Sequence, residues 1–146
     1  MPHATITGID INPDAIAQAR RADPSALSHY LVAGQLDPGE RYDAILALAV
    51  FRHGLIEATS PECCGGILSF ARFADGVARL DQCLEPDGWL ALYNGHFRFA
   101  DTCTAERYAV DAFRMTDHPP MTLLYGSDDL LIEGASDDEV LFRKLK

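Results

Sequence analysis

Thr-Gly-Ile-Asp-Ile-Asn-Pro, residues 7–13, combines the end of a strand with the start of a helix. The apolar and β-branched residues of Thr5–Ile11 predict a buried parallel strand. Asn12 is a favourable helix N-cap, and Pro13 suits the first helical position, where its missing N–H is not needed. We therefore expect a strand that passes directly into a helix ending near Ala22.

Further along the chain, short apolar runs alternate with amphipathic stretches, which is typical of βαβ units. The strand candidates are His29–Ala33, Tyr42–Val50, Trp89–Tyr93 and Met121–Tyr125. Tyr42–Val50 is an almost continuous apolar run, and such a run favours a central strand that is buried on both faces.

Two helices and a closing hairpin complete the predicted elements. Apolar residues recur at helical spacing between Gly66 and Cys83, and the turn Glu85–Gly88 follows. A second helix is expected around Thr104–Phe113. Leu130–Glu133 and Val140–Leu145 flank a polar stretch and are interpreted as the two strands of the hairpin.

Composition limits the class of protein. The chain of 146 residues is expected to form one domain, 1–146. Its net charge of −10 makes nucleic acid and anionic membranes unfavourable partners. The N-terminus does not resemble a signal peptide, and no apolar run has the length of a membrane helix, so we expect a cytoplasmic protein with reduced cysteines.

Four stretches together resemble class I S-adenosylmethionine-dependent methyltransferases. They are Gly8–Ala15, Tyr42–Ile45, Leu84–Leu90 and Val140–Lys144, and they occur in the order that this family shows. The resemblance implies an α/β fold of three layers, a Rossmann-like fold with a mostly parallel sheet and a C-terminal antiparallel hairpin. It also implies S-adenosyl-L-methionine as cofactor and methyl transfer to a small-molecule or protein acceptor.

The family's first strand, glycine-rich loop and first helix would precede the Asp10 stretch. Only six residues precede Thr7, and the chain contains no Gly-x-Gly-x-Gly. We therefore expect a truncated fold with an incomplete cofactor site. Direct pairing of Thr5–Ile11 with Tyr42–Val50 is the favoured consequence. An open strand edge in a homodimer that completes the site in trans is the alternative.

Asp10 is the leading candidate for a ligand-binding residue. A carboxylate at a strand tip can accept hydrogen bonds from both ribose hydroxyls of a nucleoside. The alternative is that Asp10 only caps the turn that follows it. Ile11 and Asn12 would line the adenosine.

Three further residues are expected to face the cofactor. The resemblance puts Gln35 where a side chain binds the adenine amino group, with Leu36 beside it, although Gln35 also fits an exposed loop amide. Backbone near Ala49 should face the ligand, because ligands bind beyond the carboxyl ends of strands in open α/β sheets.

His53 and His96 each follow a predicted strand end, where a neutral imidazole could act as general base. The alternative is an ordinary loop histidine. No metal site is predicted, because the cysteine and histidine spacings fit none. The leading function is thus methyl transfer, and the alternative is a truncated, non-catalytic partner or regulatory protein.

Overall fold

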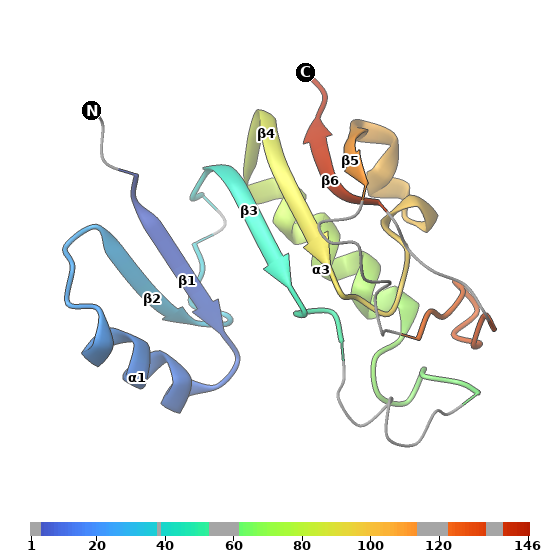
Figure 1. Cartoon of the computed structure of the whole chain (residues 1–146), viewed down its shortest axis with the longest axis horizontal. Helices are drawn as coiled ribbons and strands as arrows, with labels where there is room; N and C mark the ends of the chain where they lie inside the picture. The colour runs from blue at the N-terminus through green and yellow to red at the C-terminus, as the bar shows by residue number, and fades with distance from the viewer. Residues whose placement is uncertain (1–3, 38, 53–61, 114–122, 134–138) are drawn as a thin grey trace. The chain divides into compact units, whose positions relative to one another are not determined.

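A computed structural model describes residues 4–37, 39–52, 62–113, 123–133 and 139–146. The chain divides into two compact units, residues 1–40 (unit 1) and 41–146 (unit 2), which are described separately (Figure 1). The prediction of a single domain stays a prediction.

Unit 1 is a strand–helix–strand unit. Strand β1 (Ile6–Asp10) leads into helix α1 (Pro13–Ala22), and strand β2 (Ser28–Val32) returns parallel to β1. Asn12 caps α1, because its side-chain oxygen accepts a hydrogen bond of 2.9 Å from the backbone N–H of Asp14. The signals around 7–13 therefore predict β1 and α1, and the apolar run His29–Ala33 predicts β2, each to within one or two residues.

The larger sheet lies in unit 2. It contains β3 (Tyr42–Leu48), β4 (Leu84–Tyr93), β5 (Tyr108–Phe113) and β6 (Glu139–Lys144), in the order β3-β4-β6-β5. β3 pairs parallel to β4, whereas β6 pairs antiparallel to both β4 and β5. As Figure 1 shows, β3 is an outer strand of this sheet.

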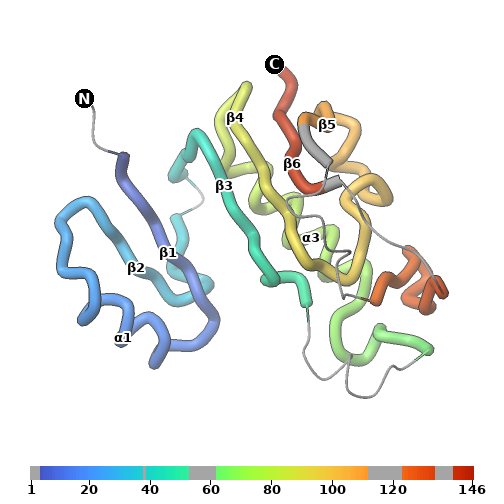
Figure 2. Tube along the Cα trace, in the orientation of Figure 1, coloured from blue at the N-terminus to red at the C-terminus, as the bar shows by residue number. Residues whose placement is uncertain are grey.

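Helix α3 (Phe70–Cys83) covers one face of that sheet, as the trace in Figure 2 shows. Ser69 caps α3 by accepting a hydrogen bond of 3.3 Å from the backbone N–H of Arg72. The predicted apolar face of the helix is confirmed, because Phe73 and Val77 are buried in one cluster with residues of β4 and β6. That cluster is the hydrophobic core of unit 2.

The predicted fold class is wrong. The structure has a two-stranded parallel sheet and a four-stranded sheet in which two of the three pairings are antiparallel, so it is not a three-layer, Rossmann-like, mostly parallel fold. The favoured pairing of the Thr5–Ile11 strand with the Tyr42–Val50 strand would join the two units, and it stays a prediction. In the described structure β1 pairs with β2, and β3 pairs with β4.

The central position, buried on both faces, that was expected for Tyr42–Val50 is also wrong. Within the described sheet β3 is an edge strand, and Leu46 and Leu48 are 64% and 49% exposed instead of buried. An apolar run shows that both faces of a strand could be buried. It does not state which strand or helix lies beside it.

The helix expected around Thr104–Phe113 is wrong as well. Two short 3₁₀ helices, η1 (Phe99–Asp101) and η2 (Cys103–Arg107), lead directly into β5. Pairing with β6 holds residues 108–113 extended, and Tyr108 packs edge-on against Phe99 at 5.2 Å between ring centroids. Tertiary pairing here overrides a weak local helical pattern.

The closing hairpin has different partners from those expected. β6 lies between β4 and β5, so Leu130–Glu133 is not its hairpin partner. Instead Leu130 forms an isolated bridge with Cys63, and Leu131 forms one with Tyr125. The Met121–Tyr125 strand candidate begins outside the described residues.

The predicted turn Glu85–Gly88 becomes an irregularity inside β4. The register with β3 changes from Tyr42↔Leu84 to Ala44↔Trp89, so the intervening residues of β4 bulge out. Asp87 has a φ of +63°, a left-handed conformation that Asp adopts more readily than most residues. The expected turn before Trp89 is therefore wrong, because residues 85–88 lie within β4 as an irregularity of the strand.

Candidate functional site

Asp10 lies at the carboxyl end of β1, where its carboxylate organises the turn into α1. Its Oδ1 accepts a hydrogen bond of 2.7 Å from the backbone N–H of Asn12. Its Oδ2 has no hydrogen-bond partner among the residues that the structure describes, and the side chain is exposed. Asp10 therefore does cap the turn, and one carboxylate oxygen remains open to a ligand.

The loop after β2 lies beside Asp10. The backbone N–H of Ala33 donates to the Asp10 carbonyl at 2.8 Å, which extends the parallel pairing beyond Val32. Gly34 has a φ of +97°, a conformation that glycine adopts without strain, and it turns the chain toward Gln35. The fold thus brings two of the predicted ligand-binding residues to one end of the small sheet.

Gln35 is engaged within its own loop. Its side-chain Oε1 accepts a hydrogen bond of 2.8 Å from the backbone N–H of Val32, and its backbone N–H donates to the Val32 carbonyl at 2.9 Å. The side-chain amide N–H groups of Gln35 are the part left to meet a ligand. Ile11 is 84% exposed, and Leu36 is half-buried.

Unit 1 also has a pocket of about 400 Å³. It lies away from Asp10 and is lined by Arg20, Asp23, Pro24, Ser25, Ser28, His29, Tyr30 and Leu31. The Tyr30 hydroxyl donates to Asp23 Oδ2 at 3.0 Å, and this hydrogen bond raises the pKa of Tyr30. These internal contacts use the polar groups of the pocket to join α1 to β2.

In unit 2, β3 and β4 end in a similar way. Ala49 follows β3 with a φ of +56°, and Asn94 follows β4 with a φ of +59°. A left-handed conformation costs about 1–2 kcal/mol for a residue such as alanine, whereas asparagine tolerates it better. The Ala49 N–H donates to the Tyr93 carbonyl at 2.8 Å, so the amide expected to face a cofactor is used within the sheet.

His96 lies in the loop after β4, and its side chain is completely buried. Its backbone N–H donates to the Phe51 carbonyl at 3.0 Å, which joins the loops that follow β3 and β4. Its Nδ1 lies 2.8 Å from the Leu123 carbonyl, whereas Nε2 has no hydrogen-bond partner within the described part of the chain. In this conformation the imidazole faces the core. His53 lies outside the described residues.

The sequence analysis did not single out two buried side chains of unit 2, Tyr125 and Cys64. The ring of Tyr125 contacts that of His96 edge-on at 5.8 Å between centroids, and the Tyr125 N–H donates to the His96 carbonyl. Cys64 is also buried, and burial together with the charge of Asp129 raises the pKa of its thiol to about 11. A thiol with a raised pKa is a poor nucleophile at neutral pH.

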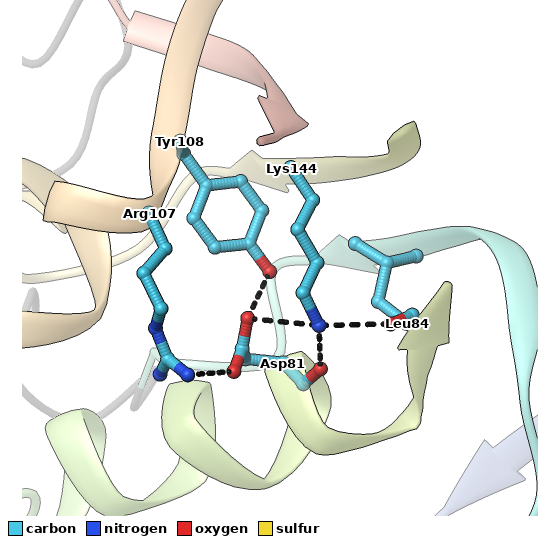
Figure 3. Close-up of polar contacts among 5 residues, drawn as sticks. All are labelled: Asp81, Leu84, Arg107, Tyr108 and Lys144. Atoms are coloured by element: carbon cyan, nitrogen blue, oxygen red, sulfur yellow. Dashed lines mark hydrogen bonds and ion pairs between the residues drawn. The ribbon is translucent and has the colours of Figure 1, made fainter. Parts of the chain in front are cut away.

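A polar cluster surrounds Asp81, near the end of α3 (Figure 3). The Asp81 carboxylate accepts a hydrogen bond of 2.8 Å from the Tyr108 hydroxyl and pairs with Arg107 at 2.8 Å and Lys144 at 3.3 Å. Lys144 also donates to the carbonyls of Asp81 and Leu84, at 2.6 and 2.9 Å. The cluster satisfies the buried charge and joins α3 to β5 and β6.

The predicted site residues are divided between the units. Unit 1 contains Asp10, Ile11, Asn12, Gln35 and Leu36, whereas unit 2 contains Ala49 and His96. Within unit 1 the structure brings the Asp10 and Gln35 loops together. The Asn94-Gly95 pair, which is a common turn signal, is the sequence feature that could have indicated the left-handed turn before His96.

Comparison with protein-family models and with curated proteins gave no match. Within the described ranges, no three or more His, Cys, Asp or Glu side chains are grouped as a metal site would require. No described helix combines the length and apolar character needed to cross a bilayer. The cytoplasmic location and the absence of nucleic-acid partners stay predictions from the sequence.

Proposed function

We propose that unit 1 binds the adenosine half of S-adenosylmethionine and that the chain serves methyl transfer to a small-molecule or protein acceptor. The main support for this proposal is the Oδ2 of Asp10, which accepts no hydrogen bond from the described residues. It lies at the carboxyl end of β1, beside the Gln35 loop. Ligands of α/β units bind beyond the carboxyl ends of parallel strands, and carboxylates accept hydrogen bonds from ribose hydroxyls.

The residues of unit 1 fit the ribose better than the adenine. Asp10 offers a free carboxylate oxygen, whereas the Oε1 of Gln35 is already bonded to the Val32 N–H. Gln35 would therefore donate from its side-chain amide to a ring nitrogen of adenine, rather than accept from the exocyclic amine. When bound, S-adenosylmethionine supplies an electrophilic methyl group, and we assign none of the described residues to its methionine carboxylate.

Calorimetric titration with S-adenosylhomocysteine tests the proposal. The Asp10→Asn variant keeps an oxygen that can accept from the Asn12 N–H, but it removes the charge offered to the ribose. A hydrogen bond to a charged group contributes about 1.5–3 kcal/mol, so we expect Kd to rise about tenfold or more.

Asp14→Asn is the matched control, because it removes another exposed carboxylate from the same turn. We expect it to leave Kd within about twofold, since its side chain is not assigned to the ligand. The absence of heat at millimolar ligand, or an equal loss in both variants, contradicts the proposed site.

The second candidate is a non-catalytic partner protein, and the burial of His96 favours it. An imidazole with no exposed surface does not reach an acceptor in this conformation. Binding of S-adenosylhomocysteine without turnover of S-adenosylmethionine in a panel of small-molecule and protein acceptors would support this second function. Turnover that survives His96→Asn would show that transfer does not need this base.

A further inference from the structure

The turn that follows β3 holds a strained backbone conformation. Ala49 has a φ of +56°, in the left-handed region that alanine rarely adopts, and such a conformation persists only where surrounding contacts fix it. The Ala49 N–H donates to the Tyr93 carbonyl at 2.8 Å. The His96 N–H donates to the Phe51 carbonyl at 3.0 Å. These two hydrogen bonds hold the turn after β3 to the turn after β4.

The side chain of Phe51 adds a third contact, on helix α3. Gly76 lies in the middle of that helix, and a Cβ atom added to it would lie only 2.6 Å from Phe51 Cε1. The Phe51 ring also meets the ring of Phe73 edge-on, at 5.1 Å between ring centroids. Glycine inside a helix is less favourable than alanine, so the helix gives up stability at this position. In return, Gly76 forms a notch that the Phe51 ring fills.

We propose that Phe51 and Gly76 form a conformational latch, which holds the turns after β3 and β4 in their observed positions. In the closed state the ring fills the notch and Ala49 stays left-handed. When the ring leaves the notch, Ala49 relaxes to an ordinary conformation and the hydrogen bond from the His96 N–H to Phe51 breaks. The latch lies beyond the carboxyl ends of two neighbouring parallel strands, which is the end of the sheet where α/β proteins bind ligands.

Hydrogen exchange of the His96 amide in the full-length chain tests the latch, because this N–H donates directly to Phe51. The amides of β4 serve as the reference for unfolding of unit 2 as a whole. In Gly76→Ala the added methyl group expels the ring, so we expect the His96 amide to exchange about tenfold faster or more. The β4 amides should change less. All residues of the latch belong to unit 2, so the proposal does not depend on adenosine binding by unit 1.

Two further variants separate the latch from the general effect of replacing a glycine. Gly66→Ala is the matched control, because a Cβ atom at Gly66 would meet no atom of the described residues within 4 Å. We expect its His96 amide to exchange at the wild-type rate. Phe51→Ala empties the notch and should itself speed exchange at His96. Adding Gly76→Ala to Phe51→Ala then meets no ring, so the His96 exchange rate should stay within about twofold of that of Phe51→Ala.

Ala49→Gly tests the strained turn in the opposite direction. Glycine adopts the left-handed conformation without the Cβ penalty, so the closed state gains stability and the His96 amide should exchange about fivefold more slowly. Exchange in Gly76→Ala that matches Gly66→Ala overturns the proposal. So does an equal acceleration at His96 and in β4, an equal effect of Gly76→Ala with and without the Phe51 ring, or an Ala49→Gly variant that exchanges no more slowly than the wild type.

Discussion

Units 1 and 2 have the same kinds of elements but very different cores. Of the hydrophobic side chains described in unit 1, only Ile16 is buried. Unit 2 buries a cluster of aromatic and aliphatic residues that includes Phe73, Phe97 and Phe142. Buried apolar area drives folding, so the stability of the chain resides mainly in unit 2, whereas the predicted ribose-binding acid lies on the weaker unit.

The largest effect is expected from a truncation in the better core. Phe73→Ala removes a buried ring and should lower the free energy of unfolding of unit 2 by about 3–5 kcal/mol. Urea unfolding followed by the fluorescence of Trp89, the single tryptophan, measures unit 2 directly. Ile16→Ala is the counterpart in unit 1. If it shifts the Trp89 unfolding transition as much as Phe73→Ala does, the stability does not reside mainly in unit 2.

The Asp81 cluster should come next. Asp81→Asn leaves Lys144 without its buried charge partner, so we expect a loss of about 3 kcal/mol. Arg107→Ala removes a partner that is 57% exposed and should cost no more than about 1 kcal/mol. Chemical unfolding of both variants checks this order, and equal losses would show that the buried carboxylate depends on Arg107.

Alkaline pH should lower the free energy of unfolding of unit 2. Burial raises the pKa of the Cys64 thiol from its ordinary value of 9.0 to about 11, and burial with the Asp81 hydrogen bond raises that of Tyr108. A raised pKa means that the folded state holds its proton more tightly. The contribution of Cys64 is present below pH 9 and is lost as pH rises through 11, whereas that of Tyr108 is present below pH 10 and is lost at higher pH than that of Cys64.

Unfolding midpoints measured between pH 8 and pH 11 check this direction. Cys64→Ala should make the pH dependence shallower between 9 and 11, because it removes one of the groups with a raised pKa. An unchanged slope in this variant would contradict a contribution from the Cys64 thiol.

The smallest effect is expected at the cap of α1. Asn12→Ala removes the acceptor for the Asp14 N–H and should cost about 1 kcal/mol of helix stability. Hydrogen exchange should show faster exchange in residues 13–22 without a change in unit 2. Asn12→Asp keeps a capping oxygen and should restore protection, so faster exchange in both variants would argue against the cap.

Sequence reasoning succeeded where the signal was local. The Asn12-Pro13 cap and the helical spacing that includes Phe73 and Val77 each depend on residues within a few positions, and each predicted its element. It failed where the partner strand is distant in the chain. β5 became a strand because β6 pairs with it, and His96 became buried because residues 123–125 cover it.

The amino-acid sequence alone therefore determines where β1 and α1 begin, that Asp10 ends a strand and which face of α3 is apolar, because capping and periodicity act over one or two helical turns. Tertiary structure decides that β3 lies at an edge, that β6 separates β4 from β5 and that the imidazole of His96 faces the core. Strand neighbours are chosen by pairing between distant segments, which no local pattern encodes.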